Sequence, residues 1–268
     1  MIDYTDLDYK TAICPNCGKL LKITYHDDGP SCLDDYDEYH GFDNTWGVCR
    51  CKDCKISGDG SRAVDYKLSS IDAWKFPKDY KITATQKQNN YLRFLARETG
   101  LRYNFIANKE VASQIIKQYL EVYTKIIKDN LYEDKIKDLL FSRDFTCYNF
   151  FRDLKNELSF YKDYTTNTET IFKVVITVNL DTEQFSFTIS SENQIDTNLQ
   201  DFASVFKRID DDIEYLKSEF FNLSYPTNDE ASKKIQEDAT AYIDNLKYLY
   251  RNNEYEYDYF DCSYDLNT

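Results

Sequence analysis

Apolar residues recur at a helical spacing through much of the chain after residue 84. The stretch "TQKQNNYLRFLARETG" (85–100) predicts a helix. Thr85 is expected to cap it, with Gln88 at the capping-box position and Gly100 as the stop. Asn108 is expected to cap a second helix. The apolar positions of that helix follow a 3.6-residue period: Ile115, Ile116, Tyr119, Leu120, Tyr123, Ile126 and Ile127.

Helical patterns return several times further along the chain. Two segments, "LYEDKIKDLLF" (131–141) and "CYNFFRDLKNELSFY" (147–161), are expected to be helical, and a long helix is expected at about 198–222. The last helix should start in "YPTNDEASKKI", where Thr227 and Glu230 stand in capping-box register. These patterns predict that the second half of the protein is mostly helical.

Two stretches break the helical pattern and predict strands. In "IFKVVITVNLDTEQFSFTIS" (171–190), two runs rich in β-branched and aromatic residues flank "NLDTE", which predicts a β-hairpin. Its residues Phe185, Phe187 and Ile189 alternate with Ser and Thr, so we expect them to form one buried face. Near the N-terminus, "LLKITY" and "TWGVCRC" alternate in the manner of short ribbon strands.

Charge divides the chain into three segments. Residues 1–74 carry 8 basic and 14 acidic groups, residues 75–128 carry 11 and 4, and residues 129–268 carry 14 and 29. A basic island therefore lies inside a protein whose net charge is −14. Clustered cations of this kind favour contact with phosphate.

Composition excludes several classes of protein. The chain has no run of 18 apolar residues and no basic-then-apolar leader, so we expect a cytoplasmic protein without a membrane span. All seven glycines lie within the first hundred residues, which excludes glycine-rich phosphate loops from the rest. No catalytic constellation is recognisable, so we do not expect an enzyme. A nuclease built from scattered carboxylates would escape this search.

Five of the eight cysteines lie between Cys14 and Cys54, at spacings typical of a metal site. "CPNCGK" places Cys14 and Cys17 in one tight turn, and "CKDCK" supplies Cys51 and Cys54. Four thiolates around one ion are the usual structural zinc site, with no open position for catalysis. The sequence therefore predicts structural Zn²⁺ and no small-molecule cofactor.

Other ligand sets stay open at this stage. The 33 residues between the two pairs include an acidic stretch with Cys32, His26 and His40. That stretch is either a solvated loop or a second metal site, and Cys32 or Cys49 could replace a ligand in the first. The remaining cysteines, Cys147 and Cys262, are expected to lie in a core and in a tail, since neither has a histidine near it in sequence.

The pattern "CPNCG … WGVCRCKDCKISGDG" resembles the zinc ribbons of phage and bacterial DNA primases and related replication proteins. The similarity covers about 45 residues, with an aromatic residue before the second cysteine pair and "SGD" after it. It implies docking to nucleic acid or protein rather than primase activity. The module after residue 84 also resembles a short helical unit found in phage-encoded proteins, which implies a phage or mobile-element setting.

The basic island is the candidate nucleic-acid surface. Arg93 and Arg97 fall on one stripe of the predicted helix, and Tyr91 and Phe94 could stack on bases. Such a surface would bind DNA or RNA without regard to sequence. An alternative is a solvated helix face that pairs with the protein's own acidic surface. The candidate residues are Lys75, Lys78, Lys81, Lys87, Tyr91, Arg93, Arg97 and Arg102.

A different function starts from the acidic C-terminal segment. Its carboxylates could imitate phosphates, so that the protein occupies a host nucleic-acid-processing complex, such as a CRISPR effector, as an anti-defence inhibitor. Acidity that only keeps the protein in solution is the simpler explanation. The candidate partner-binding residues alternate in the last stretch: Glu254, Tyr255, Glu256, Tyr257, Asp258 and Tyr259.

Together these patterns predict an α+β, mostly helical protein in three parts. They are a zinc ribbon with an acidic insertion (1–76), a basic helical module (77–128) and an acidic, mostly helical domain with one hairpin at about 171–190 (129–268). The leading hypothesis is non-catalytic association with nucleic acid.

Overall fold

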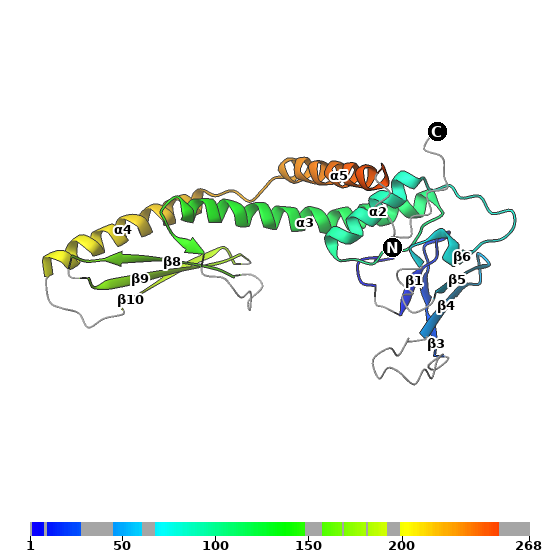
Figure 1. The fold of residues 1–268 in the computed structure, drawn as a ribbon, viewed down its shortest axis with the longest axis horizontal. Coiled ribbons are helices and arrows are strands. Elements are labelled where there is room, and N and C mark those ends of the chain that lie inside the picture. The colour runs from blue at the N-terminus through cyan, green and yellow to red at the C-terminus, as the bar shows by residue number, and fades with distance from the viewer. Residues whose placement is uncertain are drawn as a thin grey trace. The chain divides into compact units, whose positions relative to one another are not determined.

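The computed structural model describes most of the chain and shows an α+β protein with two compact units (Figure 1). Unit 1 contains the described residues up to Ile126 and those from Ser232 onward, and unit 2 runs from Ile127 to Ala231. The residues described are 2–7, 10–27, 45–60, 68–147, 157–167, 169–180, 182–191 and 199–251. No helix among these residues is long and apolar enough to cross a membrane.

Unit 1 begins with two small antiparallel sheets. The first pairs β1 (Thr11–Ile13) with β2 (Leu20–Lys22). The second has the order β3-β4-β5-β6, in which every strand pairs with its neighbour in sequence. Its strands are β3 (Thr24–Asp27), β4 (Thr45–Cys51), β5 (Ile56–Gly60) and β6 (Trp74–Lys75), and the short 3₁₀ helix η1 (Ile71–Ala73) leads into β6.

The helices of unit 1 pack through aromatic side chains. They are α2 (Gln86–Thr99), the first part of α3 (Lys109–Phe141) and α5 (Asn228–Arg251) from Ser232 on. Phe94 of α2 is buried between Tyr123 of α3, at 5.6 Å between ring centroids, and Tyr242 of α5, at 5.3 Å. Tyr123 also donates a hydrogen bond of 3.0 Å to Asp238. Phe94 therefore belongs to the core. The expectation from the sequence that Phe94 could stack on bases is wrong, because its ring is buried.

The predicted helix ends are confirmed. Thr85 and Gln88 form a complete capping box, and Gly100 ends α2 in the left-handed conformation, at φ 69°. Asn108 accepts from the backbone N–H groups of Glu110 and Val111 at the start of α3. The segment 131–141 is a continuation of that same helix rather than a separate one.

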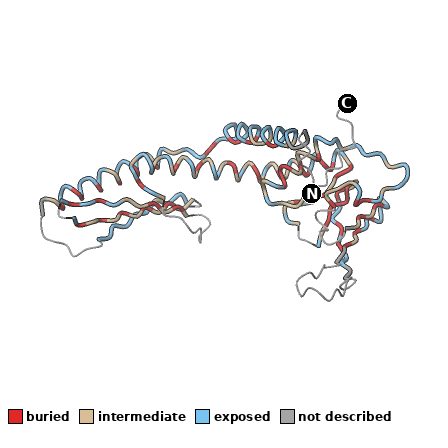
Figure 2. Tube along the Cα trace, in the orientation of Figure 1, coloured by how far each residue is buried: buried red, intermediate tan, exposed pale blue. Residues whose placement is uncertain are grey.

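Unit 2 consists of a four-stranded antiparallel sheet under helices. The sheet has the order β10-β9-β8-β7, and α4 (Leu199–Asn222) and the end of α3 cover one of its faces (Figure 1). Its strands are β7 (Thr146–Cys147), β8 (Glu157–Thr165), β9 (Ile171–Asn179) and β10 (Gln184–Ser191). Buried and half-buried residues alternate along β9, as Figure 2 shows.

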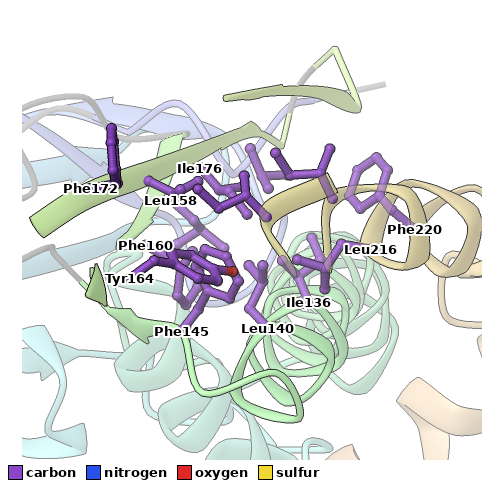
Figure 3. Close-up of a cluster of buried hydrophobic side chains, with 14 of the residues drawn as sticks. Ile136, Leu140, Phe145, Leu158, Phe160, Tyr164, Phe172, Ile176, Leu216 and Phe220 are labelled. Carbon is purple, nitrogen blue, oxygen red and sulfur yellow. The ribbon is translucent and has the colours of Figure 1, made fainter. Parts of the chain in front are cut away.

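The core of unit 2 lies between this sheet and the two helices (Figure 3). Ile136 and Leu140 come from α3, Leu216 and Phe220 come from α4, and the sheet contributes the alternate residues of β8 and β9. The buried sheet residues are Leu158, Phe160, Tyr164, Phe172, Val174, Ile176 and Val178. Packing of this kind fixes which face of each strand points inward.

One predicted element is wrong. The segment 147–161 was expected to be a helix, but Cys147 lies in β7 and residues from Glu157 onward form β8. Leu158 and Phe160 point into the core with a two-residue period, and they pair across the ladder with Val178 and Ile176. Pairing with β9 overrides the helix preference of the local sequence, so the second half contains a four-stranded sheet where one hairpin was expected.

The predicted hairpin is confirmed as β9 and β10, but the predicted burial of its alternating residues holds only in part. Eight consecutive residue pairs join the two strands, from Gln184 opposite Asn179 to Ser191 opposite Phe172. Phe185 packs against the core, whereas Phe187 and Ile189 stay exposed over 38% and 39% of their surface. The predicted domain boundaries after residues 76 and 128 remain predictions.

Candidate metal centre and its basic surroundings

Four cysteines from two turns meet in unit 1. Cys14 and Cys17 lie in the turn between β1 and β2, Cys51 ends β4, and Cys54 lies in the turn between β4 and β5; we call residues 51–55 the second cysteine turn. Their four sulfur atoms all lie within 4.8 Å of one another, and the Sγ atoms of Cys17 and Cys51 are 3.7 Å apart. The sequence-predicted ligand set is therefore brought together in space.

The geometry fits a four-coordinate metal ion such as zinc. A regular tetrahedron with Zn–S bonds of about 2.3 Å has sulfur–sulfur edges of about 3.8 Å. The separation of 3.7 Å between Cys17 and Cys51 matches this edge. Cys14 and Cys51 are buried, and Cys17 and Cys54 are half-buried, so the cluster is shielded on one side. The four-cysteine cluster on small β-sheets is consistent with a zinc ribbon.

Backbone geometry at the first turn depends on Gly18. Its N–H donates to the carbonyl of Cys14 at 3.0 Å, and its φ of 72° lies in the left-handed region that favours glycine. A Cβ atom at this position would also collide with the hydroxyl of Tyr4, which donates to the Gly18 carbonyl. Gly18 thus lets the turn close over the cysteines while Tyr4 packs against it.

Burial and hydrogen bonding act on the thiols in opposite directions. Burial raises the pKa of Cys14 far above its usual range, although the N–H groups of Cys17 and Asn16 point at its sulfur and oppose the shift. Burial also raises the pKa of Cys51, but hydrogen bonds from Cys54 and the neighbouring thiols outweigh it and leave that pKa below its usual value. A cation bound by this cluster would share the charge of the buried thiolates and offset the cost of burying them, and the converging N–H donors would add to that stabilisation.

A segment between the ribbon and α2 is tied to this cluster. We call residues 77–84 the strap. Tyr80 of the strap donates a hydrogen bond of 2.9 Å to Asn16, and Asn16 in turn donates through Nδ2 to the sulfur of Cys54 at 3.2 Å. The N–H groups of Thr83 and Ala84 bond to the carbonyl of Ala107. The strap is therefore bonded directly to the first cysteine turn and is linked to the second through Asn16.

The remaining described cysteines stand outside the cluster. Cys49 is buried two residues before Cys51, opposite Gly58 in the β4–β5 ladder, and burial raises its pKa to about 11. Cys147 packs at the edge of the core of unit 2. The cysteines at 32 and 262 and the acidic stretch around His40 lie outside the described residues.

The predicted basic helix stripe is turned toward the protein's own tyrosines. The guanidinium of Arg93 lies 5.2 Å from the ring centroid of Tyr103, and that of Arg97 lies 4.6 Å from the ring centroid of Tyr242. Arg97 also forms an ion pair of 2.6 Å with Glu98. Both arginines thus have internal partners.

The other predicted residues are more scattered. Lys78, Lys81 and Lys87 are exposed. Lys75 is exposed and pairs with Asp59 at 2.7 Å. Two further candidates are half-buried in the same unit, Tyr91 and Arg102.

Sequence reasoning missed the cations of the cysteine turns. Lys52 and Lys55 are exposed beside Cys51 and Cys54, and Arg50 precedes them on β4. Lys19 follows the first turn and pairs with Asp53. These cations were overlooked because the net charge of residues 1–74 is negative, although most of the acidic groups in that segment lie outside the ribbon strands. The repeated pattern of a lysine within two residues of each cysteine pair was the available signal.

The comparisons with known proteins give no relative. No family model matches the chain, and neither a curated protein nor a solved structure is significantly similar to it. The predicted partner-binding residues at 254–259 lie outside the described residues.

Proposed function

We propose that this protein is a zinc-containing, non-catalytic nucleic-acid-associated protein whose contact surface is the strap together with the second cysteine turn. The bound ion would crosslink the two cysteine turns and hold them in one geometry. With four cysteines as ligands, the ion would keep no open position for substrate. Its role would be structural.

The observation that carries the proposal is the hydrogen-bonded path from Tyr80 through Asn16 to Cys54. Lys81 directly follows Tyr80, and Lys55 directly follows Cys54. The path links the strap, which carries exposed Lys78 and Lys81, to the second cysteine turn, which carries exposed Lys52 and Lys55. We infer that these two lysine pairs of distant sequence origin form one surface.

Phosphate is the ligand that such a surface favours. Four exposed ammonium groups on short loops can each neutralise a phosphate without an ordered pocket, which gives binding that is strong at low salt and indifferent to sequence. The strap and turn carry few acidic groups to compete, namely Asp53 and Asp79, and Asp53 is paired with Lys19. A setting in a phage or mobile element belongs to this proposal as an expectation from the sequence resemblance.

The test is the affinity for labelled single- and double-stranded DNA and RNA at about 50 and 200 mM salt. Neutralising four phosphates of a duplex predicts a loss of roughly a hundredfold in affinity over this range. The double variant Lys55→Glu with Lys81→Glu should weaken binding at the lower salt by at least about tenfold, and it should reduce the salt slope by about two.

Two controls separate this surface from the other candidates. Lys117→Glu with Lys233→Glu makes the same charge change at exposed positions on α3 and α5, and we expect less than about a twofold effect. Arg97→Gln should also leave affinity unchanged, because its partner is Tyr242. Absence of nucleic-acid binding at low salt would refute the proposed function. Loss of binding in Arg97→Gln, with normal binding in the Lys55→Glu and Lys81→Glu double variant, would refute the strap and second cysteine turn as the contact surface.

A further inference from the structure

Strand β10 is an unprotected sheet edge. It pairs with β9 along eight consecutive residues without a bulge, and among the described residues nothing pairs with its other side. Its sequence, "QFSFTISS", contains no charged residue and no proline. Proteins usually protect an edge strand with a charge, a proline, a bulge or a covering element, because its free N–H and C=O groups can pair with another strand.

The helical layer of unit 2 also stops short of this strand. Phe187 and Ile189 stand opposite Ile176 and Val174 in the ladder, so they share the helix-covered face of the sheet with these fully buried residues. Phe187 and Ile189 nevertheless stay more than a third exposed. The helices therefore cover this face of the sheet fully over β9 and only partly over β10.

One flank of α4 runs beside this gap. Phe220 packs against Phe185 at 5.7 Å between ring centroids, and the ammonium of Lys217 lies 4.8 Å from the ring centroid of Phe187. At the other end, Phe206 lies 5.2 Å from Phe172, the residue opposite Ser191. The helix therefore contacts the start of β10 directly, and at its other end it contacts the β9 residue that pairs with the last residue of β10.

That flank is self-complementary. Phe206, Asp210, Lys217 and Phe221 all lie on the same side of α4 and are all exposed, with Phe206 at 40% and Phe221 at 81%. The two phenylalanines and the Asp–Lys pair are each centred on the same point of the helix, between residues 213 and 214. The contacts just described place this point close to Thr188, in the middle of β10.

We propose that unit 2 pairs with a second copy of this chain through antiparallel β10 strands related by a two-fold axis at Thr188. The pairing joins two four-stranded sheets into one and places Phe187 opposite Ile189 of the second copy, an aromatic and β-branched pair. Above the sheet, the antiparallel α4 helices lie side by side. Phe206 then meets Phe221 of the second copy, and Asp210 meets Lys217 of the second copy.

The exposed surface is sufficient for a weak dimer. The exposed fractions of Phe187, Ile189, Phe206 and Phe221 amount to roughly 400 Å² of apolar surface per chain. With the strand backbones, the two copies would bury on the order of 1,000–1,200 Å², at the lower end of specific interfaces. Pairing of an uncharged strand also avoids like-charge repulsion at the contact, despite a net charge of −14 per chain. This proposal stands on unit 2 alone and is independent of the proposed nucleic-acid surface.

Sedimentation velocity of the full chain at about 1–100 µM tests the pairing. We expect the mass to rise with concentration from 31.8 kDa toward twice that value. Thr188→Lys places two ammonium groups opposite each other on the axis, so it should weaken the dimer by at least about tenfold. Thr165→Lys is the matched control, because it makes the same change at an exposed position of β8.

A charge swap tests the helix contact independently. Asp210→Lys and Lys217→Asp should each weaken dimerisation, because each creates like-charge pairs across the axis, and the double variant should dimerise more tightly than either. Circular dichroism checks that each variant remains folded. A monomer at every concentration, an open growing assembly, or a dimer unaffected by Thr188→Lys would overturn the proposal.

Discussion

At Gly58 the ribbon has no room for a side chain. A Cβ atom there would lie 2.7 Å from a methyl group of Leu68, 2.9 Å from the indole ring of Trp74 and 3.0 Å from the sulfur of Cys49. The indole N–H of Trp74 is itself fixed by a bond of 3.0 Å to the carbonyl of Leu68. The glycine of the "SGD" pattern is therefore required by packing rather than by backbone conformation.

Gly58→Ala should destabilise unit 1 by about 2–3 kcal/mol, because at least one of three tightly packed neighbours must shift. Thermal unfolding followed by circular dichroism measures the effect. Gly100→Ala is the control, since its added methyl meets nothing within 4 Å and costs only the strain of a left-handed alanine, about 1 kcal/mol. Equal effects of the two variants would contradict the packing explanation.

A second residue with a decisive position is Asp212 of α4. Its Oδ2 accepts hydrogen bonds from Lys162 at 2.8 Å and from the hydroxyl of Tyr164 at 2.6 Å, and Arg143 lies 3.5 Å from Oδ1. Burial raises the pKa of Asp212, but the hydrogen bonds from Lys162 and Tyr164 outweigh this and hold the pKa below its usual value. The ionised carboxylate is thus the form that the fold stabilises.

Asp212→Asn should lower the free energy of unfolding by about 2–3 kcal/mol, because it leaves the largely buried ammonium of Lys162 without its anion. Because the folded pKa is depressed, the contribution of Asp212 is present above about pH 4 and is lost as the pH falls further. Urea unfolding at neutral and acid pH measures both effects. Asp211→Asn, at the exposed neighbouring position, should leave the free energy of unfolding almost unchanged. If Asp212→Asn lost as much stability below pH 4 as the unsubstituted protein does, this explanation would be contradicted.

At the level of elements, the ends of α2 and the β9–β10 hairpin were predictable from local signals, but strand β8 was not. The boundaries of α2 follow from Thr85, Gln88 and Gly100, which act within a few residues of one another. Strand β8 depends on partners elsewhere in the chain, as Leu158 requires Val178 and Phe160 requires Ile176. A pairing of this kind leaves only a weak two-residue alternation in the sequence, which helix-favouring neighbours concealed.

In the candidate site, too, features set by residues close in sequence were predictable and contacts between distant residues were not. Cysteine spacing identified the four ligands, because metal coordination constrains residue types at short distances in sequence. The strap contact could not be predicted, since Tyr80 and Asn16 are 64 residues apart and neither has a distinctive pattern around it. The hydrophobic periodicity of β10 correctly gave the inward face, but not that the helices leave it partly uncovered.

At the level of the whole molecule, the ribbon is joined to the first helices by several long-range hydrogen bonds. The carbonyl of Pro15 accepts from the N–H groups of Ala107 and Asn108 at 2.9 and 3.0 Å. The N–H of Ile13 donates to Asn104 at 3.0 Å, and Tyr4 and Gln118 are linked at 2.8 Å. Order in the cysteine turns is therefore coupled to the start of α3.

Removal of the metal should unfold part of unit 1 and spare unit 2. A structural zinc ion contributes roughly 10 kcal/mol to modules of this kind, so chelation, or Cys14→Ser with Cys51→Ser, should abolish order in both cysteine turns. Hydrogen exchange should show lost protection at residues 11–22, 45–60 and 101–108, with β8 and β9 unchanged. Returning zinc to the chelated protein should restore protection, and full protection without metal would refute a structural ion.

The bond between Ile13 and Asn104 also bears on how the chain is made. These residues are 91 positions apart, so at synthesis rates of about 5–20 residues per second the partner of Ile13 emerges roughly 5–20 seconds later. All four cysteine ligands are already synthesised by residue 54, well before the segment that packs over them. The nascent thiols therefore pass through an interval of exposure on the ribosome, in which early capture of the metal would protect them from oxidation.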